Sequence, residues 1–198
     1  MAPVKIFVEG DSDKKFIGDY IKFLKIENDS IDIETLSGKD IAHFKNVSPS
    51  FIKKEEEGKN LVIIDTDSKT IADKTNELSK IKLDLDLNFE AFFLPDNKST
   101  GELESLLCSI IPEKQKLYFD CIDKFSKCVK DLKQEMKPPS LKDSIHLYCC
   151  SLLTQKESKS RDKVIGLITR NYADTRFWDL NHLALLPLKQ FLTNHLVR

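Results

Sequence analysis

The stretch Leu61-Val-Ile-Ile-Asp-Thr-Asp67 runs four apolar residues, three of them β-branched, directly into two carboxylates. A continuous apolar run of this kind is typical of a strand that is buried on both faces of a parallel sheet. The two acids then lie at the carboxyl end of the strand, where open α/β sheets place their ligand sites. Unpaired acids repel each other and resist dehydration, so their presence at this position does not help the strand to fold. The simpler alternative is a turn in which an Asp caps the next helix.

A second stretch, Val4-Lys-Ile-Phe-Val-Glu-Gly-Asp-Ser-Asp13, repeats this arrangement near the start of the chain. It predicts another short apolar strand, which ends at the acid Glu9. Asp11 or Ser12 is expected to cap the helix that follows, and Asp13 lies in the first turn of that helix.

The two acidic strand ends predict a binding site if the strands are parallel neighbours. Glu9, Asp65 and Asp67 would then converge at one edge of the sheet. Carboxylates that are held together without a paired arginine favour a hard divalent cation, which prefers oxygen ligands. Without a metal they repel each other, so the pKa of at least one of them is expected to be raised.

The composition is that of an ordinary soluble globular protein, with 40% hydrophobic and 32% charged residues among 198. The formal net charge of -1 creates no global field for nucleic acid or membrane, so any such contact depends on local patches. No apolar run approaches the ~20 residues of a membrane helix, and no signal peptide is visible. We therefore predict a cytoplasmic protein that contacts no membrane. Its five cysteines have no C-x-x-C spacing and are expected to be reduced and mostly buried: Cys108, Cys121, Cys128, Cys149 and Cys150.

Strands and helices alternate along the first half of the chain. Further strands are expected at 31–36, near a sheet edge, and at 89–94, with helices at roughly 12–25, 49–57 and 71–83. The stretch Ser37-Gly-Lys-Asp40 is interpreted as a turn, because a single glycine makes no phosphate cradle. This alternation predicts an α/β fold, a Rossmann-like parallel sheet flanked by helices.

A third acidic group, Glu102 and Glu104, follows Gly101 at the start of the next predicted helix. Acids in a first turn are favoured by the helix dipole, which is a sufficient structural explanation. The alternative is that this loop leaves the carboxyl edge of the fourth strand and brings its acids to the same site.

From Pro112 onward the pattern becomes helical. Apolar residues recur at helical spacing from Tyr118 to Met136, and Pro138-Pro139 ends this long helix. With a second helix at about 140–154 it predicts a helical hairpin, with Phe125 in its core.

The last part of the chain is less regular. The polar segment 155–162 is expected to be mobile, and 164–170 is ambiguous. The apolar tail 177–192 is expected to dock back with Trp178 as a core anchor. We therefore predict an α/β core at 1–111 and a helical extension at 112–198 that packs on it as one unit.

Three acidic motifs together resemble those of the Toprim family, the metal-binding α/β domain of topoisomerases, DnaG-type primases and OLD-type nucleases. They are Glu9-Gly10, Asp65-Thr66-Asp67 and Gly101-Glu-Leu-Glu104. The spacing from Glu9 to Asp13 looks most like the OLD-type version. The chain is also similar to a stand-alone bacterial group of Toprim-like proteins with the same helical carboxyl-terminal part. The resemblance covers roughly residues 3–110.

The resemblance implies a role for each acid. Glu9 would be the general acid/base, and Asp65 and Asp67 would hold Mg²⁺ or Mn²⁺. A second metal in OLD-type nucleases would implicate the remaining acids, Asp13, Glu102 and Glu104.

A lysine downstream of the acids also takes part in OLD-type nucleases. Lys156, Lys159 and Lys163 are candidates for its counterpart by position only, and no motif distinguishes them; we take Lys159. The same basic segment could contact a nucleic-acid backbone through Lys156, Lys159, Arg161 and Lys163.

The leading hypothesis is a metal-dependent nuclease that hydrolyses nucleic-acid phosphodiesters. The chain shows no ATPase domain, topoisomerase tyrosine domain or primase zinc module, which disfavours topoisomerase or primase activity. The alternative is a non-catalytic Toprim module that binds metal, nucleic acid or a protein partner. A third reading, a receiver-like domain with Asp65 as phosphoacceptor, predicts a lone Asp after the third strand and is disfavoured by Asp67.

Overall fold

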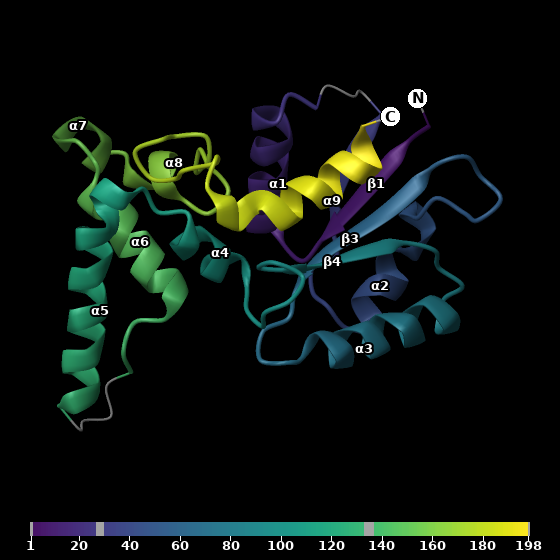
Figure 1. The fold of residues 1–198 in the computed structure, drawn as a ribbon, viewed down its shortest axis with the longest axis horizontal. Coiled ribbons are helices and arrows are strands. Elements are labelled where there is room, and N and C mark those ends of the chain that lie inside the picture. Colours follow the sequence, from purple (N-terminus) through teal and green to yellow (C-terminus); the bar gives the residue numbers. More distant parts are fainter. Residues whose placement is uncertain (1, 27–29, 133–136, 198) are drawn as a thin grey trace.

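A four-stranded parallel sheet forms the centre of the computed structural model, which describes residues 2–26, 30–132 and 137–197 (Figure 1). The strand order is β2-β1-β3-β4. The strands are β1 Val4–Val8, β2 Ile31–Thr35, β3 Lys59–Asp65 and β4 Glu90–Leu94. The predicted α/β class and the edge position of the second strand are both confirmed.

The two acidic strands are direct neighbours in this sheet. Strand β1 pairs in parallel with β3, with Val8 opposite Ile63, and β3 pairs in parallel with β4. The chain therefore moves outward from β1 to β2 on one side and from β3 to β4 on the other. The carboxyl ends of β1 and β3 lie where this order reverses, which is the usual ligand position in open α/β sheets.

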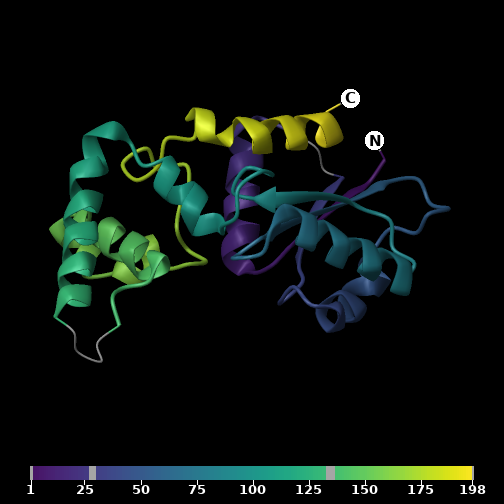
Figure 2. The same ribbon diagram turned by 60° about the horizontal axis from the view of Figure 1, so that its bottom comes forward.

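Helices cover both faces of the sheet (Figures 1 and 2). On one face, Ile6 and Leu61 belong to a core shared with α1, α4 and α9, whereas Phe7 and Val62 belong to a second core with α2 and α3. This alternation follows from the period of two in a strand. The helices are α1 Asp11–Phe23, α2 Ile41–Val47, α3 Ile71–Asp84, α4 Leu103–Ser109, α5 Lys116–Asp131, α6 Leu141–Ser151, α7 Gln155–Ser158, α8 Arg161–Ile165 and α9 Leu186–Leu196. Short 3₁₀ helices are η1 Ser48–Ser50, η2 Glu113–Gln115 and η3 Leu183–Leu185.

The carboxyl-terminal part shares the first of these cores. Trp178 is only 1% exposed, as predicted, and the hydroxyl of Tyr148 on α6 donates to the carbonyl of Phe177 at 3.0 Å. On α9, the Phe191 ring lies 5.3 Å from that of Phe92 on β4. The apolar tail therefore docks on the sheet, as expected. Helices α5 and α6 form the predicted hairpin at one end of the molecule (Figure 2).

Several local predictions were wrong in the first half. The helix expected at 49–57 is α2 at Ile41–Val47, followed by η1, because the Asp40 side chain caps it by accepting from His43 N–H. Neither Asp11 nor Ser12 caps α1. The N-cap is Gly10, whose N–H donates to the Asp13 carboxylate at 3.1 Å.

Other corrections concern the second half. Phe125, predicted as core, is 54% exposed. The segment 155–162, expected to be mobile, carries α7 and the start of α8. Of the five cysteines only Cys149 is buried, whereas Cys121 and Cys128 are exposed. Met136, at the end of the predicted long helix, lies outside the described residues. Among the helices of the described ranges, none has the length and apolar character needed to cross a bilayer.

Candidate metal and phosphodiester site

A hollow of about 560 Å³ lies at the carboxyl ends of β1 and β3. Glu9 follows β1, Asp65 ends β3, and α1 begins beside them. All six carboxylates that were predicted as metal ligands line this acidic hollow: Glu9, Asp13, Asp65, Asp67, Glu102 and Glu104. The loop after the fourth strand thus brings its acids to the same place as the first two motifs.

The backbone explains how the second and third motifs are joined. The carbonyl of Gly101 accepts from the N–H groups of Thr66 at 3.0 Å and Asp67 at 2.9 Å. The Thr66 hydroxyl is fully buried and accepts in turn from the N–H of Gly101 at 2.7 Å. Gly101 has a φ of +156°, and a Cβ there would lie 2.9 Å from the Ser105 hydroxyl. A glycine at this position therefore permits the close approach that places Glu102 beside Asp67.

Asp65 and Asp13 are held in surroundings that disfavour their charge, and the pKa of Glu102 is also raised, first by burial and then by the charges of Glu104 and Asp67. Burial, and then the charges of Asp13, Glu9 and Glu104, raise the pKa of Asp65 to about 8, although its carboxylate accepts from Leu103 N–H at 3.0 Å. Burial and the charge of Glu9 likewise raise the pKa of Asp13 to about 6. The expectation that crowding raises at least one carboxyl pKa is met by these groups.

A lysine that was not predicted as a site residue partly neutralises the hollow. The ammonium of Lys39 forms an ion pair with the Asp67 carboxylate and lies 3.7 Å from a Glu9 oxygen. Burial lowers the pKa of Lys39, but the bond to Asp67 and the charges of Glu9, Asp67 and Asp65 outweigh it and raise the pKa. Lys39 reaches the acids because its loop leaves the carboxyl end of β2, which is parallel to β1. The sequence could indicate Lys39 as a site residue only if β2 were known to lie beside β1, and the strand order is not evident from the sequence.

The donor set fits a hard divalent cation in its chemistry. Its possible ligands are oxygen atoms, chiefly carboxylates, and Oε2 of Glu9 is buried without a hydrogen-bond partner. Within the described ranges, however, no three carboxylate, imidazole or thiol groups already stand close enough together to hold an ion. The residues therefore fit the ion by type, and their side chains must turn toward it to bind.

The predicted basic residues do not line the acidic hollow. Lys156 lies on α7, Lys159 follows α7, and Arg161 and Lys163 lie on α8. The lysine that does line the hollow is Lys142, on α6. No sequence motif distinguishes Lys142, because the position of α6 over the hollow depends on how the extension packs.

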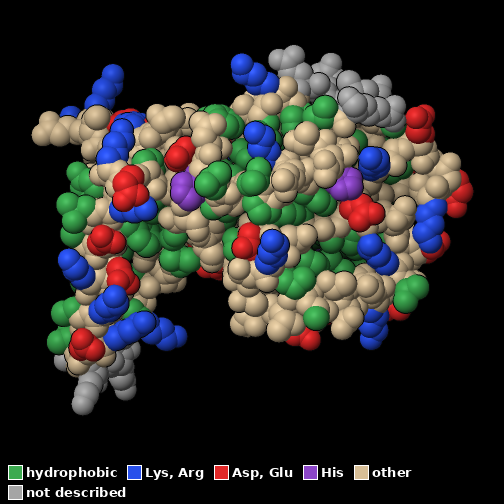
Figure 3. All heavy atoms as spheres, in the orientation of Figure 1, with side chains coloured by type: hydrophobic (Ala, Val, Ile, Leu, Met, Phe, Trp, Pro, Cys, Tyr) green, Lys and Arg blue, Asp and Glu red, His purple; other side chains and the backbone are tan. Residues whose placement is uncertain are grey.

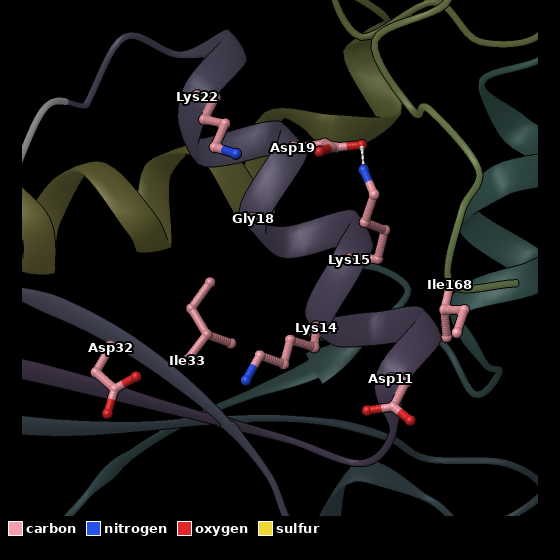
Figure 4. A pocket seen from close by; sticks show the side chains of 9 residues that line it. All are labelled: Asp11, Lys14, Lys15, Gly18, Asp19, Lys22, Asp32, Ile33 and Ile168. Carbon is pink, nitrogen blue, oxygen red and sulfur yellow. Dashed lines mark hydrogen bonds and ion pairs between the residues drawn. The ribbon is translucent and has the colours of Figure 1, made fainter.

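A second hollow, of about 650 Å³, runs along the outer side of α1 (Figure 4). We call it the α1 groove; it shares Asp11 and Ile168 with the acidic hollow. Lys15 is paired with Asp19 on the same helix. Lys14 and Lys22 also line the groove and form no ion pair with the described residues.

Comparison with known proteins gives one family and a likeness to solved structures. The sequence pattern of the family described as "Protein of unknown function (DUF3226)" matches residues 3–196. No curated protein matches the sequence. One solved structure, described as the C-terminal region of the Burkholderia pseudomallei OLD protein, is 18% identical over 100% of both chains with a TM-score of 0.46. At that similarity the likeness says nothing about the chemistry of this site.

Proposed function

The chain belongs to the family described as "Protein of unknown function (DUF3226)", and we propose that it hydrolyses nucleic-acid phosphodiesters with Mg²⁺ or Mn²⁺. The observation that carries this proposal is the convergence of six carboxylates on one hollow at the switch point of the sheet. Such a concentration of negative charge costs stability, and a bound cation would offset that cost.

Each acid has a role that follows from its position. Asp65 and Asp67 would hold the cation, with Asp13, Glu102 and Glu104 available for a second one. When bound, the cation supplies Lewis-acid chemistry at the phosphate and a water that ionises more readily. Glu9 would accept a proton from the attacking water, and its unpartnered buried Oε2 provides an acceptor.

Cationic side chains around the hollow would hold the nucleic acid. Lys142 lies at the acidic hollow itself, and the α1 groove extends from it past Lys14 and Lys22. These three lysines would contact backbone phosphates. The more distant Lys159 and its basic neighbours on α7 and α8 would act only where a longer strand reaches them.

A second candidate is a non-catalytic module. One observation favours it: Lys39 already pairs with Asp67 and lies near Glu9, so an internal cation takes part of the place of a metal. Under this alternative the protein would bind nucleic acid or a partner protein without turnover.

The variant Glu9→Gln separates the two candidates, because it keeps the shape of the side chain and removes the proton acceptor. General-base catalysis typically contributes ~10²–10⁴-fold, so cleavage should fall by that factor. The assay is digestion of plasmid, linear and single-stranded substrates with Mn²⁺, with both proteins purified identically. If neither the wild type nor Glu9→Gln cleaves any substrate, the nuclease proposal fails and the non-catalytic module remains. Equal cleavage by both would mean that Glu9 is not the base or that the activity is a contaminant.

Metal binding has its own measurement, independent of cleavage. A cation that binds only the folded protein at 100 times its Kd stabilises it by about 2.7 kcal/mol. Mn²⁺ should therefore raise the melting temperature of the wild type, and Asp65→Asn should lose most of that rise. NaCl of equal ionic strength is the control. An identical rise in both proteins would exclude this metal site.

The lysines can be compared directly through binding. Lys142→Ala should weaken nucleic-acid binding and lower its salt dependence by about one unit, as expected for one lost phosphate contact. Lys159→Ala is the matched control for the sequence-based prediction. If Lys159→Ala weakens binding of a short substrate more than Lys142→Ala does, the phosphate contact is made by the basic residues of α7 and α8 instead.

A further inference from the structure

Helix α5 carries an apolar stripe that faces water. Five apolar side chains recur along it at alternating steps of three and four residues, and all five are exposed. The last of them, Leu132, is the C-cap of the helix. Tyr118, Phe125 and Leu132 are 45%, 54% and 55% exposed. We call this stripe the α5 seam: Tyr118, Cys121, Phe125, Cys128 and Leu132.

The seam is distinct from the side of α5 that packs on its own chain. Val129 is 7% exposed, and Phe119 and Ile122 are half-buried against the core. The Phe119 ring lies 6.2 Å from that of Tyr148 on α6. The helix thus has two apolar sides, of which the described part of the chain covers one. Hydrophobic side chains are visible on the outward side of this lobe (Figure 3).

We propose that the α5 seam binds the α5 seam of a second copy of this chain, with the two helices antiparallel. A repeat of steps of three and four is the pattern of a coiled-coil seam, in which each side chain inserts between residues of a like helix. Large exposed apolar surfaces on helices mark such interaction sites. A two-fold axis pairs the seam with itself, so one stripe is sufficient for a closed dimer.

The charges beside the seam select the antiparallel direction. Lys124 and Asp131 flank it on the same side, are both exposed, and form no ion pair within the described ranges. When two α5 helices run antiparallel with Phe125 opposite the partner's Cys128, Lys124 lies opposite the partner's Asp131. The two-fold axis repeats the pair. In a parallel dimer, Lys124 would instead face the partner's Val129, which is already buried in its own chain.

The contact should be specific but weak. Only one short helix from each chain takes part, so the interface lies at the small, weakly binding end of the size range of specific complexes. The helix is already folded against α6, which spares the dimer the cost of ordering it.

The first test is the molar mass in solution, by sedimentation equilibrium over about 1–100 µM. The wild type should form dimers, and Phe125→Asp should be monomeric. At concentrations where both proteins are monomeric, their melting temperatures should agree, because Phe125 contributes little to the monomer. Leu83→Asp is the matched control: Leu83 is 82% exposed on α3 and away from the seam. A monomeric wild type at 100 µM, or a Phe125→Asp variant that still forms dimers, overturns the proposal.

The second test reports the direction of the helices. Lys124→Asp and Asp131→Lys each place like charges opposite each other twice, so each should raise the dimer Kd roughly tenfold or more. The double variant restores both pairs and should recover the wild-type Kd. A mixture of the two single variants should also form heterodimers, because each supplies the charge that the other lacks. Two weakened single variants without recovery in the double variant or the mixture would overturn the antiparallel arrangement.

Discussion

The acidic hollow and the α5 seam depart from the ordinary distribution of residues in opposite directions. In the hollow, Asp65 and Asp13 are withdrawn from water although they are acids. On α5, Phe125 and Leu132 remain in water although they are apolar. Buried polar groups and exposed apolar patches are the informative exceptions in a folded chain. Neither is explained by the stability of this chain alone, and each indicates a ligand of matching chemistry: a cation for the first and an apolar surface for the second.

The largest expected effect tests whether α1, which borders the acidic hollow, contributes more to the free energy of unfolding than the α5 seam does. Phe16 on α1 is fully buried, with its ring 5.2 Å from that of Tyr172, so Phe16→Ala should cost about 3–5 kcal/mol of unfolding free energy. Phe125→Ala should cost less than about 0.5 kcal/mol at concentrations where the chain is monomeric. Urea denaturation measures both. Similar losses would show that α5 packs with Phe125 inward.

A smaller effect tests the cost of the buried acid in the metal-free protein. Burial raises the folded pKa of Asp65 from its ordinary 3.8 to about 8, so the native state keeps a proton that the unfolded state releases. Stability from this group is therefore present below a pH of about 4 and is lost as the pH rises to about 8. With EDTA present, Asp65→Asn should remove this decline and stabilise the protein by roughly 1–3 kcal/mol at pH 8.

The control for that experiment is Asp67→Asn, in which the ion pair with Lys39 is lost. It should not stabilise the metal-free protein. Thermal denaturation across this pH range measures both variants. If the stability of the wild type instead rises from pH 4 to 8, and this rise is absent in Asp65→Asn, then Asp65 is not a buried carboxyl without an ion-pair partner.

The smallest effect has the opposite sign and belongs to the helical extension. The bidentate bond from Arg176, with further bonds from Thr154, lowers the pKa of Glu157 to about 2. Its contribution to stability is present above the ordinary pKa of 4.5 and is lost as the pH falls toward 2. Glu157→Gln should lower the melting temperature slightly at pH 7 and match the wild type near pH 2. Salt should weaken the effect because the pair is partly exposed to solvent. An unchanged melting temperature at pH 7 would show that the pair contributes nothing measurable.

The parts of the site that sequence could predict are those with a local pattern. Asp65 and Asp67 follow an apolar run, and Glu9 follows another, so strand and acid appear together in one short stretch. Lys39 and Lys142 have no such pattern. The first reaches the hollow because β2 lies beside β1, and the second because α6 packs against α4, whose acids line the hollow. Both depend on tertiary neighbours that spacing alone does not give.

Two errors in the fold have equally specific causes. On α5 the period of 3.6 was correct, but the helix has two apolar sides, and periodicity does not say which of them packs inward. The side that carries Val129 packs inward, and the side that carries Phe125 faces water. A proline favours the first turn of a helix, so Pro49 predicts a helix from 49 onward, whereas α2 already begins at Ile41 after its Asp40 cap. Both Asp at an N-cap and Pro at the first helical position indicate a helix start, and the sequence alone does not show which of the two applies.

The contacts of Tyr172 with α1 have a consequence for how the protein is made. The Tyr172 hydroxyl lies 3.1 Å from that of Ser12, and its N–H donates to Asp19 at 3.0 Å, so the beginning of the chain is held by residues near its end. During synthesis the four strands leave the ribosome long before Tyr172 does. The acidic hollow therefore gains the wall that includes Leu167 and Ile168 only after those residues have been made, well after the sheet. A nascent chain that stops before Leu167 carries all six acids but not this wall.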